Sequence, residues 1–183
     1  MIEQILDESC ALPFYFEQRD SVIISDSPVV MDLLFMEEIN GLVLKGFSTL
    51  LKDPIIAQKT YVEVLSSHDF DKFHDFNMSD DFIDILKELV GELKSTMLGV
   101  QVTKPELEMC PSFHIDKLSL RLVQCLDGKG TILQTHDGSL IETNKGDLIF
   151  LKGEMWKSKA GALRHRSPDS DQARRLLRID FLD

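Results

Sequence analysis

The spacing of apolar residues divides the chain into two halves with different patterns. In the first half the strongest signal follows Ser79, where apolar side chains recur at intervals of three and four residues, as on one face of a helix. Asp80 and Asp81 stand at the start of this stretch, where the helix dipole favours negative charge. We therefore predict an amphipathic helix that begins after Ser79 and ends near Gly99, with a stripe formed by Phe82, Ile83, Leu86, Leu89, Val90, Leu93 and Met97.

Two weaker helix signals precede this one. Residues 26–28 read Asp-Ser-Pro, a polar capping position followed by proline in the first turn, and an apolar stripe continues from there towards Gly41, which we expect to end or bend the helix. Asp53 and Pro54 give a similar start and predict a second helix over residues 55–65. Residues 21–24 (Ser-Val-Ile-Ile) fit either a short strand or simple apolar packing.

After Gly99 short β-like runs alternate with turn sequences. Asp127-Gly128 and Asp137-Gly138 are typical hairpin dipeptides, and a further turn is expected at residues 144–147. The predicted strands cover the segment around His114 and residues 100–103, 120–126, 131–134, 140–143, 148–151 and 175–181.

Many short strands with no long helix among them are typical of a double-sheet roll. We therefore predict an α+β fold in which residues 100–183 form a double-stranded β-helix of the jelly-roll or cupin-like kind. Residues 1–99 are expected to form a mainly helical region that packs on one outer face of this core. No internal repeat, low-complexity run or linker separates the two parts, which favours one fused domain.

Composition narrows the cellular context. The chain of 183 residues is long enough to bury a hydrophobic core without disulfides, and its three cysteines, Cys10, Cys110 and Cys125, show no paired spacing. The N-terminal stretch is acidic where a signal peptide would be basic, and no apolar run reaches the roughly 18 residues that crossing a bilayer requires. These features predict a soluble cytoplasmic protein without a membrane partner. The formal net charge of −11, from 20 Lys+Arg and 31 Asp+Glu, repels phosphate backbones, so nucleic acid is not an expected partner.

The candidate chemistry centres on His114 and Asp116. In an extended segment two residues separated by one other point to the same side of the chain. His165, much later in the sequence, supplies a second imidazole, and two histidines with one carboxylate are the ligand set of non-haem Fe(II) oxygenases. The sequence thus predicts a site for Fe(II), or Mn(II), formed by His114, Asp116 and His165. A His-x-Asp pair is also common by chance, and a pair without any metal is the alternative.

Arginines provide candidate anchors for a carboxylate. Arg175 alternates with Leu177 and Ile179 on the more apolar face of the last predicted strand and is expected to point inward, whereas Arg174 is expected to point outward. A planar guanidinium suits bidentate binding, so Arg175 is the predicted contact for the far carboxylate of a dicarboxylate cosubstrate. Arg121 is a second candidate for a ligand carboxylate. For both arginines a structural ion pair with an acid is an equal alternative.

Several motifs in the second half carry a family resemblance. They are Cys-Pro-x-Phe-His-x-Asp at residues 110–116, Arg121-Leu122, Gly130-Thr131, Gly146-Asp147, Lys-Gly-Glu-x-Trp at residues 152–156, His-Arg-Ser-Pro at residues 165–168 and Arg-Arg-Leu-Leu at residues 174–177. Together they resemble a bacterial family that is catalogued only as a domain of unknown function. The resemblance is dense from about residue 100 to the end of the chain.

At a coarser level, the order of His-x-Asp, Gly-Asp before an apolar strand, His and then Arg is similar to that of iron- and 2-oxoglutarate-dependent dioxygenases with a double-stranded β-helix. The resemblance implies that His114, Asp116 and His165 ligate iron and that Arg175 anchors the cosubstrate 2-oxoglutarate, in an oxygenase that acts on a small molecule or a protein side chain. Residues 152–162 form a longer link than is usual in those enzymes, either a lid or an insertion that displaces His165. A cupin-like metal protein without 2-oxoglutarate chemistry and a non-catalytic binding module are the other function classes.

The remaining candidates have ordinary structural explanations. His68 and His74 lie in an acidic, aromatic stretch that is typical of a solvated connection, and His136 adjoins a predicted turn. Trp156 fits either a substrate pocket or core packing. Cys110 has no nearby sequence feature that marks a nucleophile and is interpreted as a packing residue.

Overall fold

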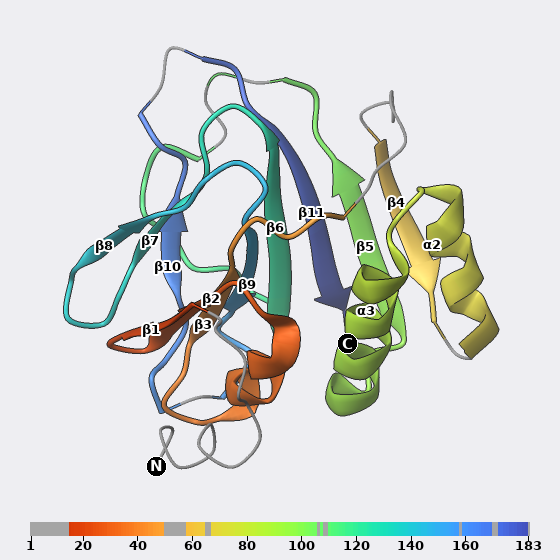
Figure 1. The fold of residues 1–183 in the computed structure, drawn as a ribbon, viewed down its shortest axis with the longest axis horizontal. Helices are drawn as coiled ribbons and strands as arrows, with labels where there is room; N and C mark the ends of the chain where they lie inside the picture. The colour runs from red at the N-terminus through yellow and green to blue at the C-terminus, as the bar shows by residue number, and fades with distance from the viewer. Residues whose placement is uncertain are drawn as a thin grey trace.

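The chain forms two β-sheets and a helical layer (Figure 1). The computed structural model describes residues 15–49, 58–64, 67–105, 107, 110–157, 159–169 and 172–182. The large sheet has eight strands, in the order β1 (Phe16–Arg19), β2 (Val22–Ser25), β3 (Gly41–Leu44), β9 (Leu148–Lys152), β6 (Leu120–Asp127), β11 (Arg175–Leu182), β5 (Met97–Val102) and β4 (Gln58–Glu63). The small sheet has three, in the order β10 (Arg164–Arg166), β7 (Ile132–Gln134) and β8 (Leu140–Glu142). The helices are η1 (Pro28–Phe35), η2 (Ser67–Phe70), α2 (Asp71–Asp75) and α3 (Asp80–Leu93).

The order of the strands defines a double-stranded β-helix. From β5 onward the chain alternates between the sheets: β5, β6, β9 and β11 belong to the large sheet, and β7, β8 and β10 to the small one. The segment at His114 joins the small sheet through an antiparallel bridge to β10. All pairings among these strands are antiparallel, and Gly138 in the β7–β8 hairpin adopts positive φ, as do the turn residues Gly128 and Gly146. The jelly-roll prediction for the second half is confirmed.

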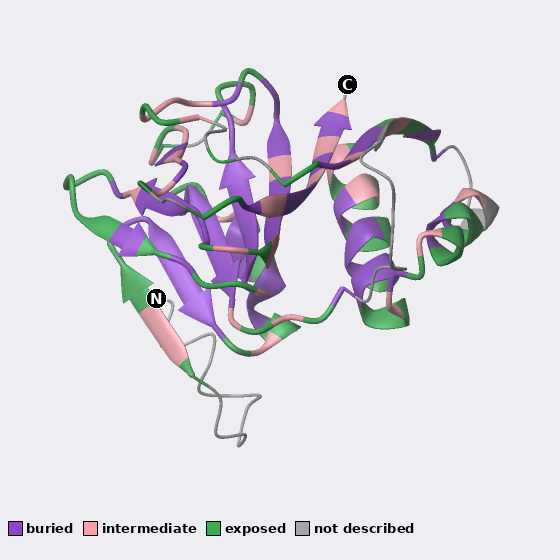
Figure 2. Cartoon of the chain, turned by 90° about the horizontal axis from the view of Figure 1, so that it is seen from above, coloured by how far each residue is buried: buried purple, intermediate pink, exposed green. Residues whose placement is uncertain are grey.

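Each face of the large sheet covers its own apolar core. One face packs against η1 and α3, and its cluster includes Leu34, Leu86, Leu177, Ile179 and Phe181. The other face lies against the small sheet, and its cluster includes Val123, Leu133, Ile141 and Leu176. Figure 2 shows the buried strands at the centre and the buried stripe of α3 turned towards them. Successive residues of β11 therefore point into two different cores. This alternation decides which arginine of β11 faces the small sheet.

The first half contains more strands than the sequence predicted. Strands β1 to β4 all precede residue 97 and extend the large sheet at both edges, so a mainly helical first half is not confirmed. Residues 21–24 fit either a strand or apolar packing by sequence, and all but Ser21 belong to the fully buried strand β2, which pairs with β3 in parallel. Helices η1 and α3 pack on one face of the large sheet and share its apolar core.

The first two predicted helices differ from the structure. The helix at Pro28 exists and is capped by Ser27, whose Oγ accepts from the Val29 N–H, but it is a 3-10 helix that ends at Phe35. Asp53 and Pro54 lie outside the described residues, and part of the helix predicted after them is strand β4, because pairing with β5 outweighs the local signal. The Ser79 cap is confirmed.

Helix α3 itself ends earlier than predicted. Its last helical residue is Leu93, because Lys94 adopts a left-handed conformation with φ 54°, which stops helical hydrogen bonding. Met97 was predicted to belong to the helical stripe and instead begins β5. Gly99 lies inside that strand, where Val100 and its neighbours pair with both β4 and β11.

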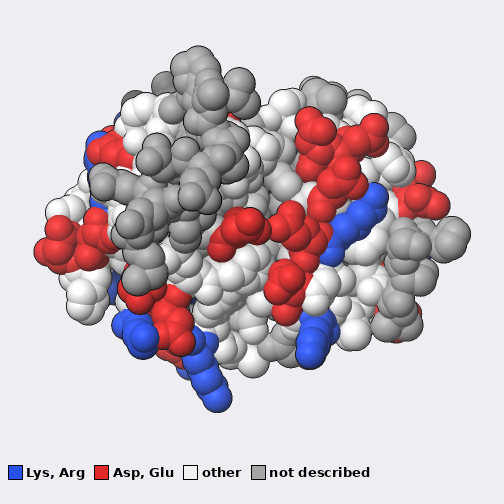
Figure 3. Space-filling view, turned by 60° about the horizontal axis from the view of Figure 1, so that its bottom comes forward, with Lys and Arg blue, Asp and Glu red and all other residues white. Residues whose placement is uncertain are grey.

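Acidic side chains predominate on the face of the molecule shown in Figure 3. Around the exposed side of α3, partial burial and the neighbouring carboxylates of Asp32 and Glu92 raise the pKa of Glu88. This crowding of like charges agrees with the net charge of −11. Among the described residues, no helix is both long and apolar enough to cross a membrane.

Candidate metal centre

His114 and His165 lie directly opposite each other across a two-residue bridge. The backbone N–H of each donates to the carbonyl oxygen of the other, with N···O distances of 3.0 Å in both directions. In such a pair the two side chains emerge on the same side of the sheet. Their ring centroids are 4.3 Å apart, and His165 is almost fully buried between the sheets. The long link before His165 therefore does not displace it from His114.

Asp116 completes the group. One ligand atom from each of His114, Asp116 and His165 lies within 4.8 Å of the others. Oδ2 of Asp116 is 3.4 Å from Nε2 of His165 and, among the described residues, has no hydrogen-bond partner although it is buried. A buried carboxylate oxygen without a partner is costly, and a cation would remove that cost. These three residues could hold a divalent metal ion.

The hydrogen bonds of the two imidazoles leave Nε2 of each ring available to bind a metal ion. Nδ1 of His114 lies 3.0 Å from the Ser112 carbonyl oxygen, and Nδ1 of His165 lies 3.3 Å from that of Leu163. A carbonyl only accepts, so each Nδ1 carries the proton and leaves the Nε2 lone pair free. Burial, opposed by the Asp116 carboxylate, lowers the pKa of His165 to about 4. His165 is therefore neutral at pH 7, as metal ligation requires.

The turn after β9 fixes the backbone around Asp116. The N–H groups of Gly153, Glu154 and Met155 donate to the carbonyl oxygens of Ser119, Asp116 and Leu118, at 2.9, 3.0 and 3.3 Å respectively. A Cβ at position 153 would lie 2.1 Å from the Leu118 oxygen and 2.7 Å from the Asp116 oxygen. Only glycine permits this approach.

Lys152 and Trp156 secure the other side of the same turn. The Lys152 side chain is fully buried, and Nζ donates to the carbonyl oxygens of Met36 and Ile39 at 3.0 and 2.6 Å. Trp156 packs against Phe35 and lies under Nζ, 4.6 Å from the ring centroid. Burial lowers the pKa of Lys152 to about 8. The Lys-Gly-Glu-x-Trp motif thus joins η1 to the segment that carries Asp116, and Trp156 serves packing.

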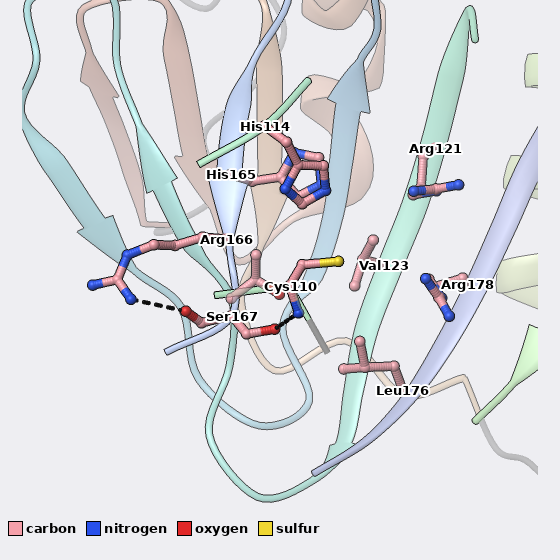
Figure 4. Close-up of a pocket in the computed structure, with 10 residues that line it drawn as sticks. Cys110, His114, Arg121, Val123, His165, Arg166, Ser167, Leu176 and Arg178 are labelled. Carbon is pink, nitrogen blue, oxygen red and sulfur yellow. Dashed lines mark hydrogen bonds between the residues drawn. The ribbon is translucent and has the colours of Figure 1, made fainter. Parts of the chain in front are cut away.

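A pocket opens beside the histidines, and Figure 4 shows its lining. Arg121 of β6 and Arg178 of β11 extend towards it from the large sheet, and Cys110 lies across from them. Cys110, which we expect to serve packing, is half-buried and lines this pocket. Sequence reasoning also missed Arg178, although its position two residues before Asp180 places both on one strand face.

The arginine predictions need correction. Arg175 was chosen because it alternates with Leu177 and Ile179, but that more apolar face of β11 packs against the helices, not against the small sheet. Arg175 lies at a β-bulge opposite Asp127 and does not line the pocket. Arg174 was expected outside and is buried, where it donates to the Gly130 carbonyl oxygen and to Thr131 Oγ1 at 3.0 Å each.

Arg121 is engaged by two acids. Nη1 donates to Asp116 Oδ1 at 2.5 Å, while Nε and Nη2 donate to the two carboxylate oxygens of Asp180 at 2.5 and 2.9 Å. The guanidinium, 16% exposed, therefore lies between one candidate metal ligand and the last strand.

The other histidines stay away from this site. His74 is exposed beside Asp80, and His136 is an exposed residue of the turn between β7 and β8, as predicted. His68 belongs to η2.

Solved structures with similar shape include three dioxygenases or hydroxylases. The dioxygenase for auxin oxidation 1 of Arabidopsis thaliana, in a complex with 2-oxoglutarate, is 15% identical, with a TM-score of 0.46 over 74% of this chain and 67% of that one. A prolyl-4-hydroxylase of Pseudomonas putida is 11% identical, with a TM-score of 0.45 over 85% and 97%. The viral collagen prolyl hydroxylase of Paramecium bursaria Chlorella virus-1 is 14% identical, with a TM-score of 0.41 over 81% and 99%. The fold of this chain is defined by its own strand order.

A family match agrees with the motifs. No curated protein matches the sequence. The model of a family described as "Protein of unknown function (DUF1826)" matches residues 51–180, more than half of the chain. The protein therefore belongs to the DUF1826 family.

Proposed function

We propose that this protein is an Fe(II)- and 2-oxoglutarate-dependent oxygenase in which His114, Asp116 and His165 hold the iron. Mn(II) is the other ion that fits this mixed set of nitrogen and oxygen donors. The observation that carries the proposal is the convergence of the three ligand atoms, with a buried Asp116 oxygen that lacks a partner. When bound, the iron would supply the redox chemistry that couples decarboxylation of the cosubstrate to oxidation of a substrate.

Arg178 takes the place of Arg175 as the proposed anchor for the cosubstrate. It lines the pocket, and its Nε is buried without a hydrogen-bond partner among the described residues. Burial, together with the nearby Arg121 guanidinium, lowers the pKa of Arg178, which means that its cation is poorly stabilised in the protein alone. A carboxylate bound to the guanidinium would satisfy the unpaired N–H and neutralise the charge.

The charge of the pocket supports a dianionic cosubstrate. Arg121, Arg166 and Arg178 carry three positive charges, and their neighbours Asp116, Asp180 and Asp169 carry three negative ones, so these six side chains sum to zero. A divalent ion would then leave an excess of two positive charges. The two carboxylates of 2-oxoglutarate would balance it, one near the ion and one at Arg178.

The substrate would be a small molecule or a protein side chain. The roles of this chain's own residues would be to orient the cosubstrate through Arg178, to keep the His165 imidazole neutral through burial, and to limit the access of water through Val123 and Leu176 at the pocket wall. A metal-binding cupin-like protein that uses no 2-oxoglutarate is the second candidate, because the ligand set alone does not require a cosubstrate.

The test is anaerobic calorimetric titration, first with Mn(II) or Fe(II) and then with 2-oxoglutarate. We expect one ion per protomer and subsequent cosubstrate binding. Asp116→Ala is expected to lose most of the metal affinity and to keep its fold, because Arg121 retains Asp180; Asp127→Ala, an exposed acid paired with Lys145, is the control. Metal binding without 2-oxoglutarate binding would favour the second candidate. Full metal retention in Asp116→Ala would refute the site.

A further inference from the structure

Two consecutive ion pairs connect Asp180 of β11, through Arg121, to Asp116 of the candidate metal site. Arg121 and Asp180 are register partners on adjacent strands, so their side chains meet across the sheet on the face of the pocket. The guanidinium binds both oxygens of Asp180 with Nε and Nη2, and its Nη1 reaches Asp116 Oδ1. The side chains of Asp180 and Asp116 are 15% and 9% exposed, so these ion pairs are largely shielded from water.

This arrangement divides the two oxygens of Asp116 between two tasks. Oδ1 accepts from Arg121, and Oδ2 lies 3.4 Å from His165 Nε2 with no hydrogen-bond partner of its own. A carboxylate held in this way presents one defined oxygen to a cation. The two hydrogen bonds from Arg121 to Asp180 also fix the plane of the guanidinium. That plane sets the direction of the remaining hydrogen bond, from Nη1 to Asp116.

The alternative role for Arg121, binding a ligand carboxylate, fits this geometry poorly. Three of its donor nitrogens already bind carboxylate oxygens at 2.5 to 2.9 Å. A ligand would have to displace Asp116 or Asp180 and leave a shielded carboxylate without its partner, which is expensive. Arg178, with its unpartnered Nε, is the better group for an incoming anion.

We propose that Arg121, itself held by Asp180, is a positioning residue that fixes Asp116 as a one-oxygen metal ligand. The inference rests on the proposed metal site. It assigns to Arg121 a role in metal affinity rather than in cosubstrate binding. Asp180 acts one step further away, because its carboxylate binds the Arg121 guanidinium, which in turn binds Asp116.

The experiment compares Arg121→Gln and the double variant Arg121→Gln/Asp180→Asn with the wild type. The double variant removes the guanidinium together with its strand partner, so it leaves no unpaired charge at position 180 if the single variant folds poorly. Arg166→Gln is the matched control, because it breaks another bidentate arginine–aspartate pair, with Asp169, beside the same pocket. Co(II) is the probe, since its visible absorption reports the ligand geometry as well as the occupancy.

Loss of a residue that orients a metal ligand typically costs about 10- to 100-fold in metal affinity. We expect a loss of that size and an altered Co(II) spectrum in both Arg121 variants, with neither change in Arg166→Gln. A purely structural role would lower the melting temperature and leave the affinity and spectrum of the folded protein unchanged. That result would overturn the proposal.

A metal-free crystal structure of the double variant separates this proposal from the proposed function. We expect the Asp116 side chain to leave its position once Nη1 of Arg121 is gone. An unchanged Asp116 would contradict the positioning role. If the wild type binds neither Co(II) nor Fe(II), the proposed function fails, and the position of Asp116 in this structure still decides whether Arg121 holds it.

Discussion

The backbone groups of His114 and His165 are hydrogen-bonded to each other in both directions, at 3.0 Å each, so the register of one bridge sets the distance between the two imidazoles. Side chains in a strand alternate between its faces. A slip of one residue at this bridge would therefore turn one imidazole away from the other. The candidate site depends on strand pairing as directly as it depends on the identity of its residues.

The close approach at Gly153 gives the first prediction. Gly153→Ala would place a methyl group 2.1 Å from the Leu118 carbonyl oxygen, so the turn must move away from Asp116. We expect a loss of about 1–3 kcal/mol in the free energy of unfolding, as for other overpacked sites, and weaker metal binding. Urea unfolding and metal titration measure the two effects.

Gly91→Ala is the matched control for this substitution. Gly91 is an exposed residue of α3 with no atom within 4 Å of an added Cβ. Alanine should stabilise the helix by about 1 kcal/mol and leave metal binding unchanged. Equal effects of the two substitutions on metal binding would contradict the supporting role of the turn.

The second prediction concerns the two arginines of β11. Arg178→Gln should weaken 2-oxoglutarate binding to the metal-loaded protein at least about 30-fold, because removing one partner of a buried charge pair costs about 2 kcal/mol or more. Arg175→Gln should bind the cosubstrate like the wild type, since Arg175 does not line the pocket. Calorimetric titration under anaerobic conditions distinguishes them. Weaker 2-oxoglutarate binding in Arg175→Gln, with wild-type binding in Arg178→Gln, would show that Arg175 is the anchor instead.

The third prediction follows from the lowered pKa of His165, which is about 4 in the folded protein. An unfolded histidine takes up its proton near pH 6.5. Between these values the unfolded chain binds the extra proton, so the free energy of unfolding of the metal-free protein should fall as the pH drops from about 6.5 to about 4, by roughly 3 kcal/mol. Above pH 6.5 the imidazole is neutral in both states and makes no such contribution.

Urea unfolding in the presence of a chelator checks this pH dependence. His165→Gln removes the titrating group and should reduce the decline between pH 6.5 and pH 4. His136→Gln changes an exposed histidine of a turn and should retain the wild-type decline. A decline of the same size in His165→Gln and the wild type would show that burial of His165 is not its cause.

The sequence by itself determined the elements whose signals are local. The cap at Ser79 depends on a hydrogen bond within one helix, and the stripe of α3 follows from the spacing of its apolar residues. The turns at Gly128 and Gly138 depend on a backbone conformation that glycine adopts freely. The His-x-Asp spacing likewise places two side chains on one side of an extended segment. For this reason the second half could be predicted as a jelly roll with His114, Asp116 and His165 as its candidate ligands.

Only the tertiary structure decided which face of each strand meets which partner. The alternation along β11 places Leu177 and Ile179 on one face and Arg178 and Asp180 on the other. It does not show which of these two faces meets the small sheet, because the apolar face is buried by helices distant in sequence. Strand β4 was mistaken for a helix for a related reason, since its conformation is fixed by hydrogen bonds to β5 rather than by its own residues. The contact of Arg121 with Asp116 and Asp180 also joins three segments that meet only when the roll closes.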